Sequence, residues 1–124
     1  MQIPGNLKYT KDHEWTKIEG DTAIIGITDF AQSELGDIVY VELPEVGAQT
    51  KQGESFGTIE AVKAVSDLFA PLTGEVLEVN SELSDKPEVI NKDPYGDGWI
   101  IKIKLSDKGE LEKLLDKSKY EELI

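Results

Sequence analysis

The sequence predicts a mainly β protein with one short internal helix and a helical segment at the C-terminus. Runs rich in β-branched and aromatic residues recur along the chain, and glycine or proline separates them. Near residue 107 the spacing of apolar side chains changes to that of a helix. A chain of 124 residues has the length of one domain, so we expect a single domain over residues 1–124.

The first elements are predicted to be a short strand and a β-hairpin. Residues 7–10 have the composition of a short strand. Residues 12–19 alternate loosely, and Gly20-Asp21 is typical of a tight turn into a second strand over residues 22–28. Gly26 interrupts this second strand and indicates a bulge or the close approach of another group.

The internal helix is predicted over residues 29–35. Asp29 and Gln32 have the spacing of a capping box, and Gly36 provides a stop at the C-terminal end. Residues 38–43 follow as a strand because their β propensity is high.

Two polar stretches of the second half predict irregular structure. Residues 49–54 are expected to be a loop. Residues 80–94 contain two prolines, of which Pro87 can open one turn of helix. Between these stretches, residues 75–79 predict another strand.

The C-terminal part predicts a strand followed by the helical segment. Residues 99–105 alternate, and one face would carry Trp99, Ile101, Ile103 and Leu105. Leucines then recur at helical spacing over about residues 107–123, and Asp107 with Glu110 has a second capping-box form. We expect this segment to pack on the β structure, because a lone helix of this length is marginal in water.

Lys63 stands in unusual surroundings for a surface lysine. It lies within the stretch 56–76, with Ala61 and Val62 before it and Ala64 and Val65 after it. Apolar residues in this stretch have helical spacing, so periodicity alone favours a helix that carries Lys63 on its surface. A glycine upstream and the sequence Ala-Pro-Leu-Thr-Gly downstream argue against that interpretation, because they end a helix abruptly.

Four blocks of sequence lie in order along nearly the whole chain: residues 13–15 (His-Glu-Trp), 26–44, 59–76 and 94–99. Together these blocks resemble the H proteins of the glycine cleavage system. In that family a lysine at the tip of a tight hairpin carries lipoic acid in an amide bond, and Lys63 is the matching residue. The resemblance therefore implies a strand, a turn and a strand around Lys63. It also implies a lipoyl-type barrel-sandwich hybrid of two antiparallel sheets.

The resemblance implies a carrier rather than an enzyme. The lipoyl group on Lys63 would take the aminomethyl group of glycine from a pyridoxal-phosphate glycine decarboxylase (P protein). It would deliver this group to a tetrahydrofolate-dependent aminomethyltransferase (T protein), and dihydrolipoamide dehydrogenase (L protein) would reoxidise the dithiol. A lipoate ligase or lipoyl transferase would attach the lipoyl group, and the carrier is expected to be a monomer.

Four further residues acquire expected roles from the resemblance. Glu60 and Gly74 match positions that matter for recognition by the attaching enzyme. Glu14 and Asp67 match the cleft that protects the loaded arm, where a carboxylate can hold a cationic amine by a charge-assisted hydrogen bond. Each residue also has a plainer interpretation, as an ordinary acid or as a turn glycine.

Two positions depart from the family pattern, and one residue invites a metal-site interpretation. Ala61 stands where the family usually has serine, and Glu34 stands where some members have a histidine near the arm.

His13 is the only histidine, and the chain has no cysteine. One histidine makes neither a convincing metal site nor a nucleophilic triad, so we expect a structural role and no metal.

The charge of the chain limits the classes of partner. A net charge of −12, from 25 acidic and 13 basic residues, argues against nucleic acid and against an anionic membrane surface. No apolar run approaches the ~20 residues that span a bilayer. The N-terminus resembles neither a signal peptide nor an arginine-rich leader, which predicts a cytoplasmic protein, or a mitochondrial matrix protein that has lost its leader.

Other functions stay open at this point. An H-like protein that relays lipoyl groups in protein lipoylation would share these features, and an acidic interaction domain is the alternative if Lys63 is never modified. A biotinyl carrier would have methionine on both sides of its lysine, whereas Val62 and Ala64 flank Lys63. An enzyme is disfavoured because the chain offers only scattered acids and no matched nucleophile and base.

Overall fold

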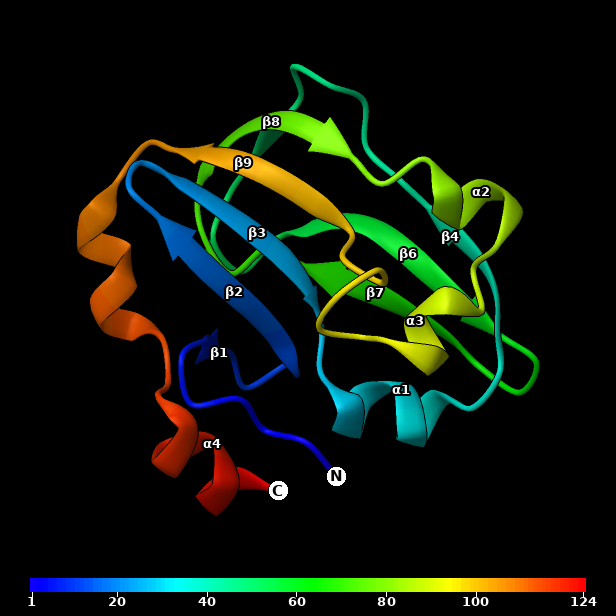
Figure 1. Ribbon diagram of the computed structural model, residues 1–124. Helices are drawn as coiled ribbons and strands as arrows, with labels where there is room; N and C mark the ends of the chain where they lie inside the picture. The colour runs from blue at the N-terminus through cyan, green and yellow to red at the C-terminus, as the bar shows by residue number, and fades with distance from the viewer.

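The computed structural model describes residues 1–124 as two antiparallel sheets with short helices around them (Figure 1). The strands are β1 (Lys8–Tyr9), β2 (Glu14–Glu19), β3 (Thr22–Ile27), β4 (Ile38–Glu42), β5 (Gln49–Thr50), β6 (Ser55–Ala61), β7 (Val65–Phe69), β8 (Gly74–Val79) and β9 (Ile101–Leu105). The helices are α1 (Asp29–Leu35), α2 (Glu82–Asp85), α3 (Val89–Lys92), the 3-10 helix η1 (Lys108–Lys113) and α4 (Lys117–Leu123). The predicted fold class is therefore confirmed.

The six-stranded sheet has the order β1-β2-β3-β9-β8-β5, and the three-stranded sheet has the order β4-β6-β7. A core of apolar side chains fills the space between the two sheets. The larger sheet contributes residues such as Ile25 and Ile101, and the smaller sheet contributes residues such as Ile59 and Leu68. Burying one face of each sheet is the usual solution for two packed antiparallel sheets. None of the helices has the length and apolar character needed to cross a bilayer.

A second apolar cluster joins the two ends of the chain to the edge of the larger sheet. Its buried members are Leu7, Tyr9, Trp15 and Tyr120. The ring of Trp15 lies over Gly26, where a Cβ would come within 2.6 Å of the indole. The close approach predicted at Gly26 is therefore confirmed, and the approaching group is the tryptophan of the paired strand.

Helix α1 has the predicted bounds, but its capping residue was predicted wrongly. The Thr28 side chain accepts a hydrogen bond from the Ala31 amide at 3.1 Å, so Thr28 is the N-cap. Asp29 instead accepts from the Gln2 amide and from the side chain of Gln32. Threonine and aspartate are both good N-caps, and here the extended backbone of Thr28 decides between them. Gly36 ends the helix with φ 79°, as predicted.

The stretch around Lys63 is a hairpin, so the helical interpretation of its periodicity was wrong. Strand β6 pairs on one side with β4 and on the other with β7. Ile59 and Leu68 face the main core from these two strands, and their neighbours point outward. The helical spacing arose by chance from inward and outward apolar residues on both strands of one hairpin.

Of two expectations about the middle of the chain, the loop over residues 49–54 needs correction and the helical turn after Pro87 is met. Residues 49–54 are not entirely a loop, because Gln49 and Thr50 form the edge strand β5, which pairs with Glu75 and Gly74. A two-residue edge strand leaves no propensity signal, since its partner supplies the hydrogen bonds. The turn of helix predicted after Pro87 is present as α3.

The C-terminal part departs from prediction in two ways. Strand β9 begins at Ile101, and Trp99 packs against the second cluster instead of sharing a face with Ile101. The helical segment is not continuous, because residues 114–116 are extended between η1 and α4. There Leu115 exchanges two backbone hydrogen bonds of 2.8 Å with Tyr9. This pairing outweighs the helical spacing of the leucines.

The predicted capping box at Asp107 is only half formed. The Asp107 side chain accepts from the Gly109 amide at 2.9 Å. Glu110 does not return the contact, because its carboxylate accepts at 2.7 Å from both the amide and the hydroxyl of Thr73. Glu110 therefore ties η1 to the segment before β8.

Candidate functional site

Lys63 lies on the turn, residues 62–64, that joins β6 to β7. The Ala61 amide donates to the Ala64 carbonyl at 2.7 Å and closes the turn. The side chains of the turn point into solvent, and that of Val62 is 75% exposed. An exposed amine on a tight tip is accessible to an enzyme that must reach it.

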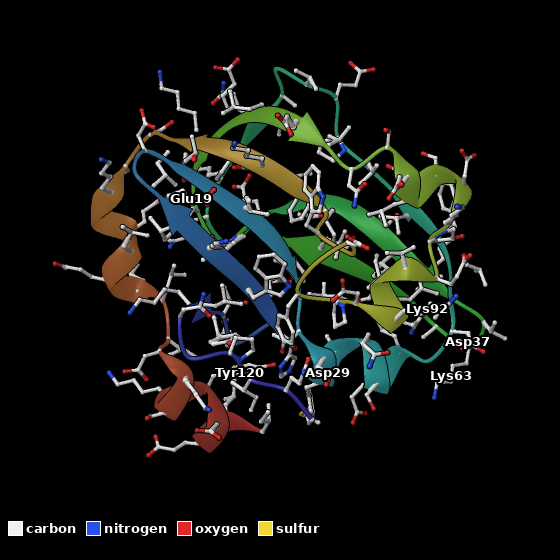
Figure 2. The ribbon with its side chains drawn as sticks, in the orientation of Figure 1. Glu19, Asp29, Asp37, Lys63, Lys92 and Tyr120 are labelled. Carbon is white, nitrogen blue, oxygen red and sulfur yellow. The ribbon has the colours of Figure 1, made fainter.

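The tip is fixed to the segment after α1. The Val62 amide donates to the Asp37 carbonyl at 3.0 Å. The stem of Lys63 passes over Gly36, where a Cβ would lie 3.1 Å from Lys63 Cε. Figure 2 shows Lys63 beside Asp37 at the C-terminal end of α1. The backbone beneath Lys63 is therefore positioned by a neighbouring element as well as by the hairpin.

A hollow of about 400 Å³ lies between α1 and the start of β7. We call it the outer hollow. It is lined by Asp12, His13, Phe30, Ala31, Glu34, Leu35 and Ser66. Apolar side chains of α1 make up part of its wall, and polar groups complete it. Ser66 is only three residues after Lys63, so the outer hollow begins close to the tip.

A second hollow, of about 270 Å³, contains Glu14, and we call it the inner hollow. Its lining comprises Thr10, Lys11, Asp12, Glu14, Gln52, Gly53, Ala70, Pro71, Lys113, Leu114 and Leu115. Asp12 borders both hollows, and Ala70 directly follows β7. Strand β7 therefore leads from the lysine tip, past the outer hollow, to the inner one.

Glu14 is a buried carboxyl at the seam between the two sheets, with only 2% of its surface exposed. The Thr10 hydroxyl donates to its Oε1 at 2.6 Å, and the Phe69 amide of β7 donates to its Oε2 at 3.3 Å. Burial raises the pKa of Glu14 to about 8, and these two hydrogen bonds only partly oppose the rise. No cation of the chain pairs with this carboxyl, because the only ion pair joins Lys17 to Glu19.

His13 forms part of the outer hollow, in a backbone conformation that is uncommon outside glycine, with φ 69°. Its Nδ1 lies 2.9 Å from the Tyr120 hydroxyl, and its ring contacts Phe30. Burial lowers the pKa of His13, although Asp12 and Glu34 oppose the shift. The expected structural role fits these contacts, but the position on the wall of a hollow had no signal in the sequence.

The other predicted residues are spread over the molecule. Glu60 lies on β6, three residues before Lys63 and opposite Val65. Asp67 is exposed on β7, near the Ser55 hydroxyl at 3.4 Å, and lines neither hollow. Gly74 is on the larger sheet, where a Cβ would lie 2.1 Å from the Lys104 carbonyl oxygen. Close packing of two backbones is therefore sufficient to require glycine at position 74.

Three groups around the site escaped the sequence analysis. Thr10 and the Phe69 amide hold the Glu14 carboxyl, and Asn91 holds the segment beneath the lysine tip. A Thr-x-x-x-Glu spacing across a strand start could have suggested the first contact. The other two depend on tertiary packing and leave no local pattern.

A family model described as glycine cleavage H-protein matches residues 7–124. The chain belongs to the glycine cleavage H-protein family. A glycine cleavage system H protein from Brevibacillus brevis is 57% identical over 124 residues, which cover 100% of this chain and 98% of that protein. One from Halothermothrix orenii is 58% identical over 120 residues, covering 97% and 94%. The crystal structure of an H protein from Mycobacterium marinum has a TM-score of 0.87 and 46% identity, covering 95% of each chain.

Membership of the H-protein family confirms the resemblance on which the sequence analysis relied. The family consists of non-catalytic lipoyl carriers of glycine catabolism, so this chain is a carrier and not an enzyme.

Proposed function

We propose that Lys63 carries the lipoyl group as an amide, and that the loaded arm lies along β7 with its amine at Glu14. The supporting observation is the pairing of an exposed lysine at one end of β7 with a buried, unpaired carboxyl at the other. Phe69 lies six residues after Lys63 in the chain, which corresponds to roughly 20 Å of extended strand. The two hollows along this path offer the volume and mixed polarity that a short apolar arm requires.

The residues present fit a lipoyl group. Lys63 provides an accessible primary amine, and Phe30, Ala31 and Leu35 provide an apolar wall beside it. Bound as an amide, the group would supply a redox-active dithiolane, whose sulfur can accept the aminomethyl group of glycine. The chain has no cysteine, so its thiol chemistry must come from such an attachment.

Glu14 would hold the cationic amine of the loaded arm. With a pKa raised to about 8, the empty carboxyl keeps its proton near neutral pH. A cation placed beside it favours the carboxylate, so the proton would leave as the amine arrives. Thr10 and the Phe69 amide already hold both oxygens, and the resulting ion pair would be a charge-assisted hydrogen bond at a carboxyl that is only 2% exposed.

The exposed tip suits a carrier that visits several partners. We propose that glycine decarboxylase, the aminomethyltransferase and dihydrolipoamide dehydrogenase each meet the arm of one monomeric domain spanning residues 1–124, in the cytoplasm. A tethered arm keeps a high effective concentration of its cargo at each visit. Glu60 lies on the same hairpin as Lys63, and it would be contacted by the lipoate ligase or lipoyl transferase. Gly74 would act in that recognition indirectly, by shaping β8.

Mass spectrometry of the protein from cells supplied with lipoate tests the proposal. We expect one lipoyl group on the peptide that contains Lys63. The Lys63→Arg variant should carry none and should unfold at the same temperature, whereas Lys51→Arg, at another exposed lysine, should be lipoylated normally. An unmodified Lys63 in the presence of a competent ligase would contradict the proposal and favour an acidic interaction domain.

A further inference from the structure

The lysine tip depends on a segment outside its own hairpin. Residues 62–64 form one backbone hydrogen bond beyond the hairpin, from the Val62 amide to the Asp37 carbonyl at 3.0 Å. The Lys63 stem lies against Gly36, on the same segment. Whatever fixes residues 36–38 therefore also fixes the backbone that presents Lys63.

One side chain holds this segment on both sides of Asp37. Asn91, in α3, accepts from the Ile38 amide through Oδ1 at 3.0 Å. Its Nδ2 donates to the Gly36 carbonyl at 2.9 Å. The same Nδ2 donates to the Gln32 side-chain carbonyl at 3.0 Å, which extends the contact into α1. Asn91 is half-buried, so these hydrogen bonds face less competition from water than surface contacts do.

Only a side-chain amide satisfies this arrangement. The Ile38 amide requires an acceptor, while the Gly36 and Gln32 carbonyls require a donor. Aspartate at position 91 would keep the acceptor but would turn a carboxylate oxygen toward two carbonyl oxygens. Alanine would leave all three groups without this partner.

We propose that Asn91 is a positioning residue for lipoyl attachment, which holds residues 36–38 and through them the Val62–Lys63 turn in the form that the attaching enzyme accepts. The proposal rests on the proposed function, because it assigns a role in the modification of Lys63. None of the hydrogen bonds of Asn91 involves Lys63. Asn91 would act through the hydrogen bond from the Val62 amide to the Asp37 carbonyl.

Asn80 provides a matched control. Its side chain also bridges two backbone groups, donating to the Asp97 carbonyl at 2.8 Å and to the Trp99 carbonyl at 2.7 Å. It is 6% exposed, and it holds the loop before β9 instead of the segment under the tip. Asn80→Ala therefore removes a comparable clamp without touching residues 36–38.

The experiment compares the full-length wild type with Asn91→Ala, Asn91→Asp and Asn80→Ala. Hydrogen exchange of the Val62 amide should become about tenfold faster in both Asn91 variants and stay unchanged in Asn80→Ala. With purified lipoate ligase, kcat/KM for lipoylation should fall roughly tenfold in the Asn91 variants only. Urea denaturation of each variant shows how much unfolding free energy was lost.

Two results would overturn the proposal. One is normal Val62 exchange and normal kcat/KM in Asn91→Ala. The other is an equal fall in kcat/KM in Asn80→Ala at an equal loss of stability, which would make Asn91 a structural residue only. If the wild type accepts no lipoyl group, the proposed function fails, and the Val62 exchange rates still decide whether Asn91 positions the tip.

Discussion

The two ends of β7 present opposite environments. At one end Lys63 is exposed on a turn that one backbone hydrogen bond connects to the rest of the protein. At the other end Glu14 is buried at the seam of the sheets, with a donor on each oxygen. Attachment of a group requires access, whereas protection of a labile cargo requires exclusion of water. In the proposed function, the fold would meet both requirements by separating them along a single strand.

The buried end can be tested by making Glu14 neutral. In Glu14→Gln, the amine of the loaded arm loses its ion pair, and we expect hydrolysis of the aminomethyl-loaded form to be roughly tenfold faster or more. The lifetime of the loaded form, followed by release of formaldehyde and ammonia, measures this effect. Glu78→Gln, at an exposed acid of β8, is the control. Equal lifetimes of the loaded form in Glu14→Gln and the wild type would show that Glu14 does not protect the loaded arm.

The same carboxyl makes the stability of the empty carrier depend on pH. Folding raises the pKa of Glu14 from 4.5 to about 8, so the folded state binds more protons than the unfolded state between these values. The free energy of unfolding should therefore fall as pH rises from about 5 to 8, by at most about 1.4 kcal/mol per pH unit. Urea denaturation of wild type and Glu14→Gln across this range should give profiles that converge in acid. Parallel profiles would contradict the burial effect.

The exposed end can be tested at Gly36, where two requirements for glycine coincide. Alanine there would be strained at φ 79° and would press on the Lys63 stem. Gly47→Ala is a matched control, because Gly47 has φ 93° but no neighbour within 4 Å. Both variants should lose about 1 kcal/mol of unfolding free energy. Only Gly36→Ala should also slow lipoylation, and equal rates would show that the Lys63 stem does not need the glycine.

The smallest expected effect concerns Tyr120, whose hydroxyl contacts His13 on the wall of the outer hollow. Tyr120→Phe removes the hydroxyl that lies 2.7 Å from Thr28 Oγ1 and 2.9 Å from His13 Nδ1. We expect a loss of about 1 kcal/mol in unfolding free energy, since buried partners remain without the hydroxyl. Chemical denaturation measures this loss. Tyr9→Phe serves as the comparison, because it removes the hydroxyl from the ring that stacks on Tyr120. A stability equal to that of the wild type would show that water replaces the hydroxyl.

Much of the fold was predictable from local sequence. The hairpin around Gly20, the helix ending at Gly36 and the strand before Leu43 all follow from turn, capping and propensity rules. The predictions that failed depend on tertiary contacts. Leu115 is extended and pairs with Tyr9, and Trp99 packs in the second cluster. The sequence near these two residues gives no indication of either partner.

The candidate site was predictable only through family resemblance. Periodicity around Lys63 favoured a helix, and the hairpin followed from the matching sequence blocks. Glu14 has no special signal in a run of polar residues, and its burial appears only once β2 and β7 meet. The cleft role of Asp67 stays a prediction, because its exposed side chain lines neither hollow, and Glu14 is the buried carboxyl among those that line the hollows. Asn91 lies far from Lys63 in sequence, so no local rule could connect them.

The extended residues before α4 have a consequence for biosynthesis. Leu114 and Leu115 line the inner hollow, so the wall around Glu14 is completed by a part of the chain that is translated after both sheets. The hairpin that bears Lys63 and its partner β4 are translated long before. A chain truncated before residue 114 would keep the attachment hairpin but lack this wall. If Lys63 and Glu14 act as proposed, such a chain would accept the lipoyl group but would lose its aminomethyl group to hydrolysis faster than the full-length protein.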